Sequence, residues 1–198
     1  MKKIPKIIVA LAISQGISGL SVAASPGAYI GGGVGYGVTK DFEDATRQDN
    51  GGVAGQVAAG YNFNQYFGLE AGYSMFSKAS YSANDYYGLS ADLNVNAFTL
   101  LGKGYIPLGK ESPWDIYGMV GMAYMLETAN VKYYSDNLLS NSRNAPAFAG
   151  GGGISRQLTK HIRAGVESLV TQKIDGNETH IPIPQTILTT FNLAYTFD

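Results

Sequence analysis

The sequence predicts an all-β fold, an eight-stranded antiparallel up-and-down transmembrane β-barrel. Eight segments alternate apolar residues with small or polar ones at a period of two, which is the pattern of strands with one apolar face. Aromatic residues stand at the ends of these apolar faces, where the side chains of a membrane barrel meet the two interfaces. Connections that are short at one end and long at the other are typical of such barrels.

The clearest strand pair lies at 53–63 and 67–75, on either side of a three-residue polar turn. Odd-numbered residues form an apolar face, and even-numbered residues form a face of small and polar side chains. A soluble sandwich would also have one apolar face, but here the polar face carries a single carboxylate, Glu70, among small and amide side chains. That face suits a narrow, filled lumen, and about ten tilted residues span the ~25 Å apolar band of an outer membrane.

Six further strands are expected, at 29–38, 93–106, 114–125, 147–158, 162–170 and 187–197. The glycines of 29–38 do not have the spacing of a phosphate-binding loop, and no helical pattern follows them. In 93–106 an inward Lys103 places Leu101 inward but Asn94 and Asn96 outward, and we expect a β-bulge to reconcile these faces. The glycines at 150–153 are expected to let their strand bend at a barrel corner.

The connections differ in length at the two ends of the predicted barrel. Three are short (64–66, 108–113 and 159–160) and are expected to face the periplasm. Four are long and polar, and are expected as loops outside the cell: 39–52, 77–92, 127–146 and 172–185. Six basic and ten acidic residues fall in these four segments, so the predicted outer surface is acidic.

Residues 1–24 have the features of a secretory signal peptide, and 25–198 are expected to form the barrel domain. Lys2, Lys3 and Lys6 precede an apolar run, and small residues at 22–24 provide a cleavage site. Without these lysines the chain has 11 basic and 15 acidic residues, a net charge of −4, so no nucleic acid is expected as a partner. The chain has no cysteine, which excludes disulfides and thiolate metal ligands, and we expect no metal and no cofactor.

Five motifs are spread over nearly the whole chain after the leader: GYNFNQYFGLEAGY, LLGKGYIPL, DIYGMVGMAYM, FAGGGG and NLAYTF. In these motifs the chain resembles the N-terminal transmembrane domain of the OmpA family of outer-membrane barrels. It implies a bacterial outer-membrane location and a lumen charge gate whose first pair is matched by Glu70 and Lys103. The family's second acid falls at Ser155 and its second cation at Gly165, and Met119 stands where the family often has an arginine. The sequence shows no C-terminal peptidoglycan-binding domain.

The lumen is the first candidate site, and its charges form either a gate or a structural plug. Because side chains fill an eight-stranded barrel, inward charges must pair or be hydrated. Arg163 and Glu167 share a lumen-facing side, so a rearranged second pair is possible. The predicted lumen charge network is Glu70, Lys103, Asp115, Arg163 and Glu167.

Aromatic residues form two further predicted sets. The membrane girdle comprises Tyr61, Phe63, Phe67, Tyr73, Trp114, Tyr124, Tyr195 and Phe197. The contact candidates in the outer loops are Tyr81, Tyr86, Tyr87, Tyr133 and Tyr134. Tyrosine adds amphipathic contact area at low entropic cost, although these side chains could equally extend the girdle above the membrane.

The sequence favours an integral outer-membrane barrel with a structural, envelope-integrity role or an adhesin-like surface role through its four outer loops. The alternatives are a narrow gated pore of low conductance and a lipid-modifying enzyme. No catalytic residues are assigned, because neither His161 nor His180 neighbours a serine in a recognisable catalytic pattern. Expected partners are outer-membrane lipid and lipopolysaccharide, the barrel-assembly machinery, which in the family reads a terminal aromatic (here Phe197 is penultimate), and a host or cell-surface ligand. The expected state is a monomer.

Overall fold

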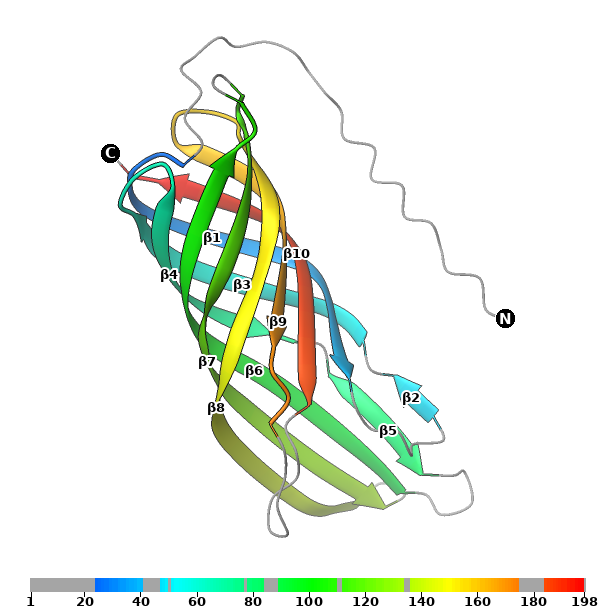
Figure 1. Ribbon diagram of the computed structural model, residues 1–198. Helices are drawn as coiled ribbons and strands as arrows, with labels where there is room; N and C mark the ends of the chain where they lie inside the picture. The colour runs from blue at the N-terminus through cyan, green and yellow to red at the C-terminus, as the bar shows by residue number, and fades with distance from the viewer. Residues whose placement is uncertain are drawn as a thin grey trace.

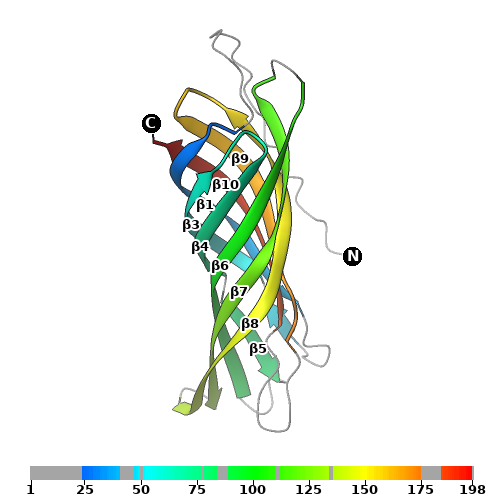
Figure 2. The same ribbon diagram turned by 60° about the vertical axis from the view of Figure 1, so that its left-hand side comes forward.

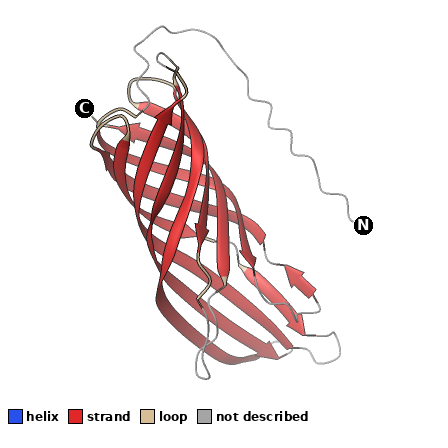
Figure 3. Ribbon diagram, in the orientation of Figure 1, coloured by secondary structure: helices blue, strands red, loops and turns tan. Residues whose placement is uncertain are grey.

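The computed structural model describes residues 24–40, 47–49, 51–76, 78–83, 89–109, 112–133, 136–174 and 184–197. These residues form ten β-strands and no helix (Figure 3). Within the same ranges, therefore, no helix is long and apolar enough to cross a membrane. Apart from Ala24, the expected signal peptide lies outside the described residues.

Eight strands close into a barrel in which each strand pairs antiparallel with both neighbours (Figure 1). The closing contact joins the first strand to the last, from Tyr29 opposite Thr196 to Lys40 opposite Gln185. This confirms the predicted eight-stranded up-and-down barrel. Its strands are β1 (Gly27–Lys40), β3 (Gly51–Asn62), β4 (Phe67–Met75), β6 (Leu89–Pro107), β7 (Trp114–Tyr133), β8 (Asp136–Gln157), β9 (Ile162–Thr171) and β10 (Gln185–Thr196).

The short connections lie together at one end of the barrel, near the C-terminus (Figure 1). Between β3 and β4, Asn64 Oδ1 accepts hydrogen bonds from the N–H groups of Tyr66 (2.7 Å) and Phe67 (2.9 Å). Thr159 Oγ1 accepts the N–H of Ile162 (3.0 Å) in the turn between β8 and β9. Asn and Thr side chains close such turns locally, which explains why these connections need so few residues.

At the other end, β6, β7 and β8 continue along the barrel axis well past the ends of the other barrel strands (Figure 2). Two short strands extend the sheet at the side of β6: β5 (Ala79–Ala83) pairs with β6, and β2 (Arg47–Asp49) pairs with β5. We call this surface the outer sheet: β2, β5, and 89–96 of β6, 126–133 of β7 and 136–145 of β8. The outer sheet contradicts the expectation that 77–92 and 127–146 are loops. The predicted loop 39–52 is also wrong in part, because it contains β2 and the ends of β1 and β3.

The physical reason for this error is the polarity of the outer strands. The segment 136–145 lacks the sustained apolar alternation by which strands are recognised in a sequence. Its backbone can still pair, because β7 and β8 already lie side by side inside the membrane and the ladder simply continues to Tyr133 opposite Asp136. The register shifts once, between Val131 and Lys132.

The expected bulge in β6 is also wrong for the described residues. β6 pairs with β7 without a register shift from Leu89 to Pro107, and Leu101 and Lys103 both point into the lumen. Asn94 is exposed because it lies beyond the membrane-facing Phe98, on the outer sheet, where a polar side chain meets water. Strict alternation therefore holds from Leu93 to Ile106.

Inward side chains divide the lumen into two parts. Towards the outer end, a buried apolar cluster contains Leu101, Met119, Met125, Leu169 and Leu188. Towards the short turns, the inward residues are charged or polar. The polar part therefore lies between the apolar cluster and the periplasmic end.

Candidate functional site

Lys103 lies at the centre of the polar part of the lumen. From β6 its Nζ lies 2.7 Å from Glu70 Oε2 on β4 and 3.0 Å from Glu167 Oε2 on β9. All three side chains are at least nine-tenths buried. One cation thus bridges two carboxylates across the lumen, whereas the OmpA-family resemblance implied two separate pairs.

Three uncharged side chains complete this cluster. Tyr29 donates a hydrogen bond to Glu70 Oε2 (2.8 Å), and Tyr117 donates one to Glu167 Oε2 (2.8 Å). Gln56 Nε2 donates to Glu167 Oε1 (2.8 Å). These donors offset the single negative charge that remains after Lys103 is counted against two acids. Sequence reasoning did not select them, although alternation already places all three on inward faces.

Glycines opposite the two tyrosines make room for their rings. A Cβ at Gly60 would lie 2.5 Å from the Tyr29 ring, and one at Gly153 would lie 2.6 Å from the Tyr117 hydroxyl. The run at 150–153 pairs with both neighbouring strands without a register shift. In this barrel, glycine at 153 therefore provides space for a hydrogen-bonding tyrosine.

A second polar cluster lies closer to the short turns. Ser155 Oγ donates a 2.5 Å hydrogen bond to Asp115 Oδ1, and Arg163 Nη2 lies 3.9 Å from Asp115 Oδ2. The Arg163 guanidinium also lies over the ring of Tyr105, at 5.3 Å. The structure therefore brings Arg163 to Asp115, and Glu167 to Lys103.

A cavity of about 60 Å³ lies between these clusters. This exceeds the roughly 10–15 Å³ that one water molecule needs, so the cavity has room for water. Its lining combines charged and amide side chains: Gln56, Glu70, Lys103, Arg163, Glu167 and Asn192. The arrangement can hold trapped water against paired charges, and the apolar cluster covers it on the outer side.

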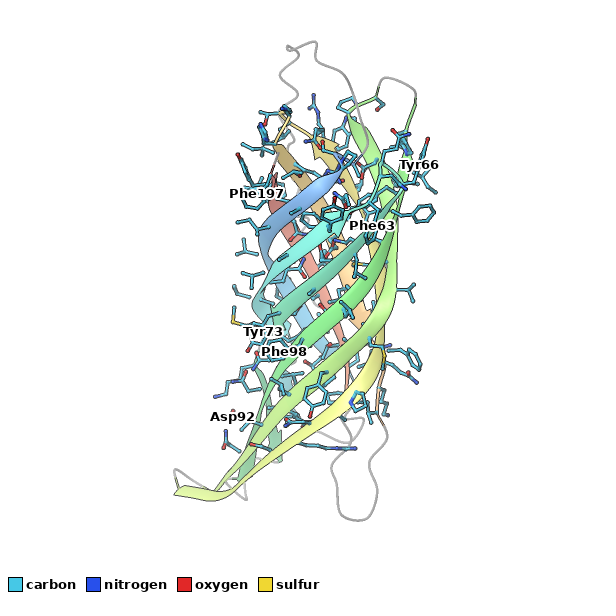
Figure 4. All side chains as sticks on the ribbon, turned by 90° about the vertical axis from the view of Figure 1, so that its left-hand side faces the viewer. Phe63, Tyr66, Tyr73, Asp92, Phe98 and Phe197 are labelled. Atoms are coloured by element: carbon cyan, nitrogen blue, oxygen red, sulfur yellow. The ribbon has the colours of Figure 1, made fainter. Side chains whose placement is uncertain are left out.

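Aromatic side chains stand at two levels of the outward surface. Near the turns these are Tyr61, Phe63, Phe67, Trp114, Tyr195 and Phe197, joined by Tyr66, and at the other level they are Tyr73 and Tyr124, joined by Phe98. Figure 4 shows Phe63, Tyr66 and Phe197 at one level and the tilted ring pair Tyr73 and Phe98 (4.8 Å between ring centroids) at the other. We call these levels the inner ring and the outer ring. Asp92 lies beyond the outer ring (Figure 4).

The predicted loop tyrosines are placed only in part. Tyr81 belongs to β5 and Tyr133 to β7, so these two lie on strands and not in loops. Tyr86, Tyr87 and Tyr134 lie outside the described residues.

Within the described residues, neither the one placed histidine nor any group of metal-ligand side chains forms a second candidate site. The ring of His161 lies at the inner end of the barrel, with Nδ1 3.0 Å from the carbonyl oxygen of Thr196, and stacks on Tyr195. His180 is outside the described residues. No three His, Cys, Asp or Glu side chains within the described ranges are grouped as metal ligands.

The closed antiparallel barrel, the two aromatic rings and the charged lumen together have the architecture of an outer-membrane protein. Residues 7–197 match the family described as outer membrane protein beta-barrel domain. The chain belongs to this family. Its location is the bacterial outer membrane, and the predicted resemblance to OmpA-like barrels is confirmed. A search of curated protein sequences gives no significant match.

Solved structures with the same fold are distant in sequence. The outer membrane protein OprG of Pseudomonas aeruginosa is 15% identical with a TM-score of 0.58, over 89% of this chain and 99% of that one. The attachment invasion locus protein Ail of Yersinia pestis is 14% identical with a TM-score of 0.55, over 87% and 100%. The N-terminal β-barrel domain of Pseudomonas aeruginosa OprF is 13% identical with a TM-score of 0.54, over 87% and 98%. At these identities the similarity concerns the fold.

Proposed function

We propose that the chain acts at the cell surface as a sealed barrel that holds the outer sheet in place for contact with a ligand. The observation that carries this proposal is the length of the strands beyond the outer ring. β7 continues for nine residues past Tyr124, which at about 3.3 Å per residue is roughly 30 Å of strand. A barrel that served only to stabilise the membrane would not need strands of this length.

The lumen supports this role over that of a pore. Lys103 and its two carboxylates neutralise much of one another's charge in the inner part of the lumen. Beyond them, Leu101, Leu169 and Leu188 are each at most 2% exposed and fill the path with apolar side chains. An ion passing this point would exchange its hydration for a few threonine hydroxyls among these leucines, which is unfavourable.

Charge restricts the kind of ligand. The four outer segments carry ten acidic and six basic residues, so a polyanion would be repelled. One of the similar solved structures is Ail in complex with the heparin analogue sucrose octasulfate, at 15% identity and a TM-score of 0.57. The acidic outer segments of this chain favour a basic or uncharged polar surface instead.

The surface role is tested by shortening the hairpin that β7 and β8 form in the outer sheet. Replacing 128–142 by Asn-Gly closes β7 and β8 at the Glu127–Arg143 pair with a two-residue turn. Bacterial cells expressing the intact or the trimmed chain are compared for adhesion to immobilised matrix proteins and to heparin. Lys160→Gln, in the turn between β8 and β9, is the control that leaves the outer sheet intact.

We expect the intact chain and the control to adhere to at least one matrix protein and the trimmed chain to lose this adhesion. Equal adhesion of intact and trimmed chains at equal surface levels would contradict the surface role and leave the envelope-integrity role. Adhesion to heparin that disappears on trimming would keep the surface role but refute the charge argument.

A further inference from the structure

Arg156 is the one charged side chain on the outward surface of the described barrel strands between the inner and outer rings. It lies at the inner end of β8, where its neighbours Ser155 and Gln157 point inward. The other outward positions on these strands, from the inner ring to the outer ring, hold uncharged residues. A charge on a lipid-facing surface is costly unless it lies at the interface and has a partner there.

The position of Arg156 is fixed by Trp114. The two residues are direct cross-strand neighbours on β7 and β8, and the guanidinium lies 5.5 Å from the centre of the indole ring. Tryptophan prefers the level of the lipid headgroups, so this stacking holds the guanidinium at that depth. On the β9 side the neighbour is Ala164, which leaves the guanidinium uncrowded.

The guanidinium has a donor that the protein does not use. Arg156 Nε is buried and has no hydrogen-bond partner among the described residues. Because Nε is covered by protein atoms, a ligand must approach the Nη end of the guanidinium, where two donors lie side by side and match two oxygens of a phosphate. This end, held at headgroup depth by Trp114, can therefore bind a phosphate group.

The outward surface between Arg156 and the middle of the membrane has the shape for an acyl chain. Ile116 and Ile154 form the next outward row and are each 40% exposed. The row after that holds Gly118 opposite Gly152, and no atom lies within 4 Å of where a Cβ of Gly118 would be. A lipid tail can lie over the isoleucines and into this depression while its headgroup stays at Arg156.

We infer that Arg156 and Trp114 form a binding site for the phosphodiester headgroup of an anionic phospholipid in the periplasmic leaflet. The net positive charge of the site favours an anionic over a zwitterionic lipid, because the latter brings its own ammonium group. One charge-assisted hydrogen-bonded contact corresponds to about a three- to tenfold local enrichment of the anionic lipid.

The test uses Trp114 itself, which is the only tryptophan of the chain. The protein is folded into phosphatidylcholine vesicles that contain either phosphatidylglycerol or phosphatidylcholine with acyl chains brominated near the headgroup. Bromine quenches tryptophan fluorescence at short range, so the ratio of quenching by the two lipids at equal mole fraction reports the enrichment next to Trp114.

We expect brominated phosphatidylglycerol to quench more strongly, and Arg156→Gln to bring the ratio to one. Arg156→Lys, which keeps the charge but has no planar guanidinium, should give an intermediate ratio. This conservative variant still tests the inference if Arg156→Gln does not fold. Lys160→Gln removes the same charge from an exposed turn position and should leave the ratio unchanged.

Equal quenching by both lipids in the unaltered chain, or a preference that survives Arg156→Gln, would overturn the inference. Millimolar inorganic phosphate is added in a parallel series to separate a lipid from a free anion. A preference abolished by phosphate would identify a general phosphate site and refute a lipid-specific one.

Discussion

Lys103 is shared by two buried carboxylates, so replacing the lysine should destabilise the fold more than replacing either acid. Without the lysine, Glu70 and Glu167 would both be buried without a cation, whereas loss of either acid leaves an ion pair. We expect Lys103→Met to lower the free energy of unfolding by about 3–5 kcal/mol. Glu70→Gln should cost about 1–3 kcal/mol, since the Tyr29 donor and Lys103 remain.

Urea unfolding in lipid vesicles measures both losses. The double variant Lys103→Met/Glu70→Gln should lose less unfolding free energy than the sum of the two single losses, because the side chains are in contact. Equal losses at Lys103 and Glu70, or strict additivity, would show that the lysine does not bridge the two acids.

The same residue distinguishes a plug from a gate. If Lys103 and its acids were the only barrier, Lys103→Met would raise conductance in planar bilayers. Because Leu101, Leu169 and Leu188 close the lumen beyond it, we expect conductance to stay at background. Discrete channel openings in Lys103→Met but not in Val120→Ala, a lipid-facing control, would support the gated pore.

Glu127 gives the outer sheet a pH dependence. It lies three residues beyond Tyr124, is 3% exposed and has Oε2 without a hydrogen-bond partner among the described residues. Its cross-strand neighbours are Arg143 on β8 and Val95 on β6. Burial raises the pKa of Glu127 from 4.5 to about 7, and the attraction of Arg143 opposes this only in part.

The raised pKa fixes the sign of the effect. Between pH 4.5 and 7 the folded chain retains a proton that the unfolded chain has released, so the free energy of unfolding falls as pH rises. The slope is at most about 1.4 kcal/mol per pH unit. Urea titrations at several pH values should show that Glu127→Gln removes this fall, while Asp92→Asn, at an acid already paired with Lys78, keeps it. A slope unchanged by Glu127→Gln would refute the assignment.

At the scale of elements, β7 provides the test of membrane position. Val120 is 71% exposed and lies between Trp114 of the inner ring and Tyr124 of the outer ring. An Arg near the midplane of a barrel costs about 2–4 kcal/mol, and one near an interface about 0–1 kcal/mol. Val120→Arg should therefore lower the free energy of unfolding in vesicles much more than Tyr124→Arg. Equal costs would mean that the rings do not mark the interfaces.

The strands inside the membrane could be predicted from the sequence because each has one apolar face. In 67–75 alternation alone places Glu70 inward, as observed. In 93–106 the inward position of Lys103 rested on the family motif as well as on alternation, and it too is observed. The outer sheet could not be predicted in this way, since segments such as 136–145 carry no such pattern in their sequence. Similarly, alternation gives the side on which Arg163 lies but not its partner, because distances across the lumen depend on tilt and closure of the whole barrel.

The whole molecule has two unlike ends. The turns joining β3 to β4 and β8 to β9 lie at one end with the C-terminus, and the outer sheet lies at the other (Figure 1). The inner end needs only turns of a few residues, whereas the outer end carries the acidic segments. This asymmetry predicts that the outer sheet faces the medium and the short turns face the periplasm.

The absence of cysteine from the chain allows a direct test of this orientation. Ser142 on β8 and Lys160 in the turn between β8 and β9 are both exposed, and they stand at opposite ends of the barrel. In intact cells a membrane-impermeant maleimide should label Ser142→Cys and not Lys160→Cys, because only the first thiol faces the external medium. After the outer membrane is permeabilised, both should react, which shows that both thiols are accessible in the folded barrel. Labelling of Lys160→Cys alone in intact cells would mean that the barrel is inserted the other way round, with the outer sheet in the periplasm.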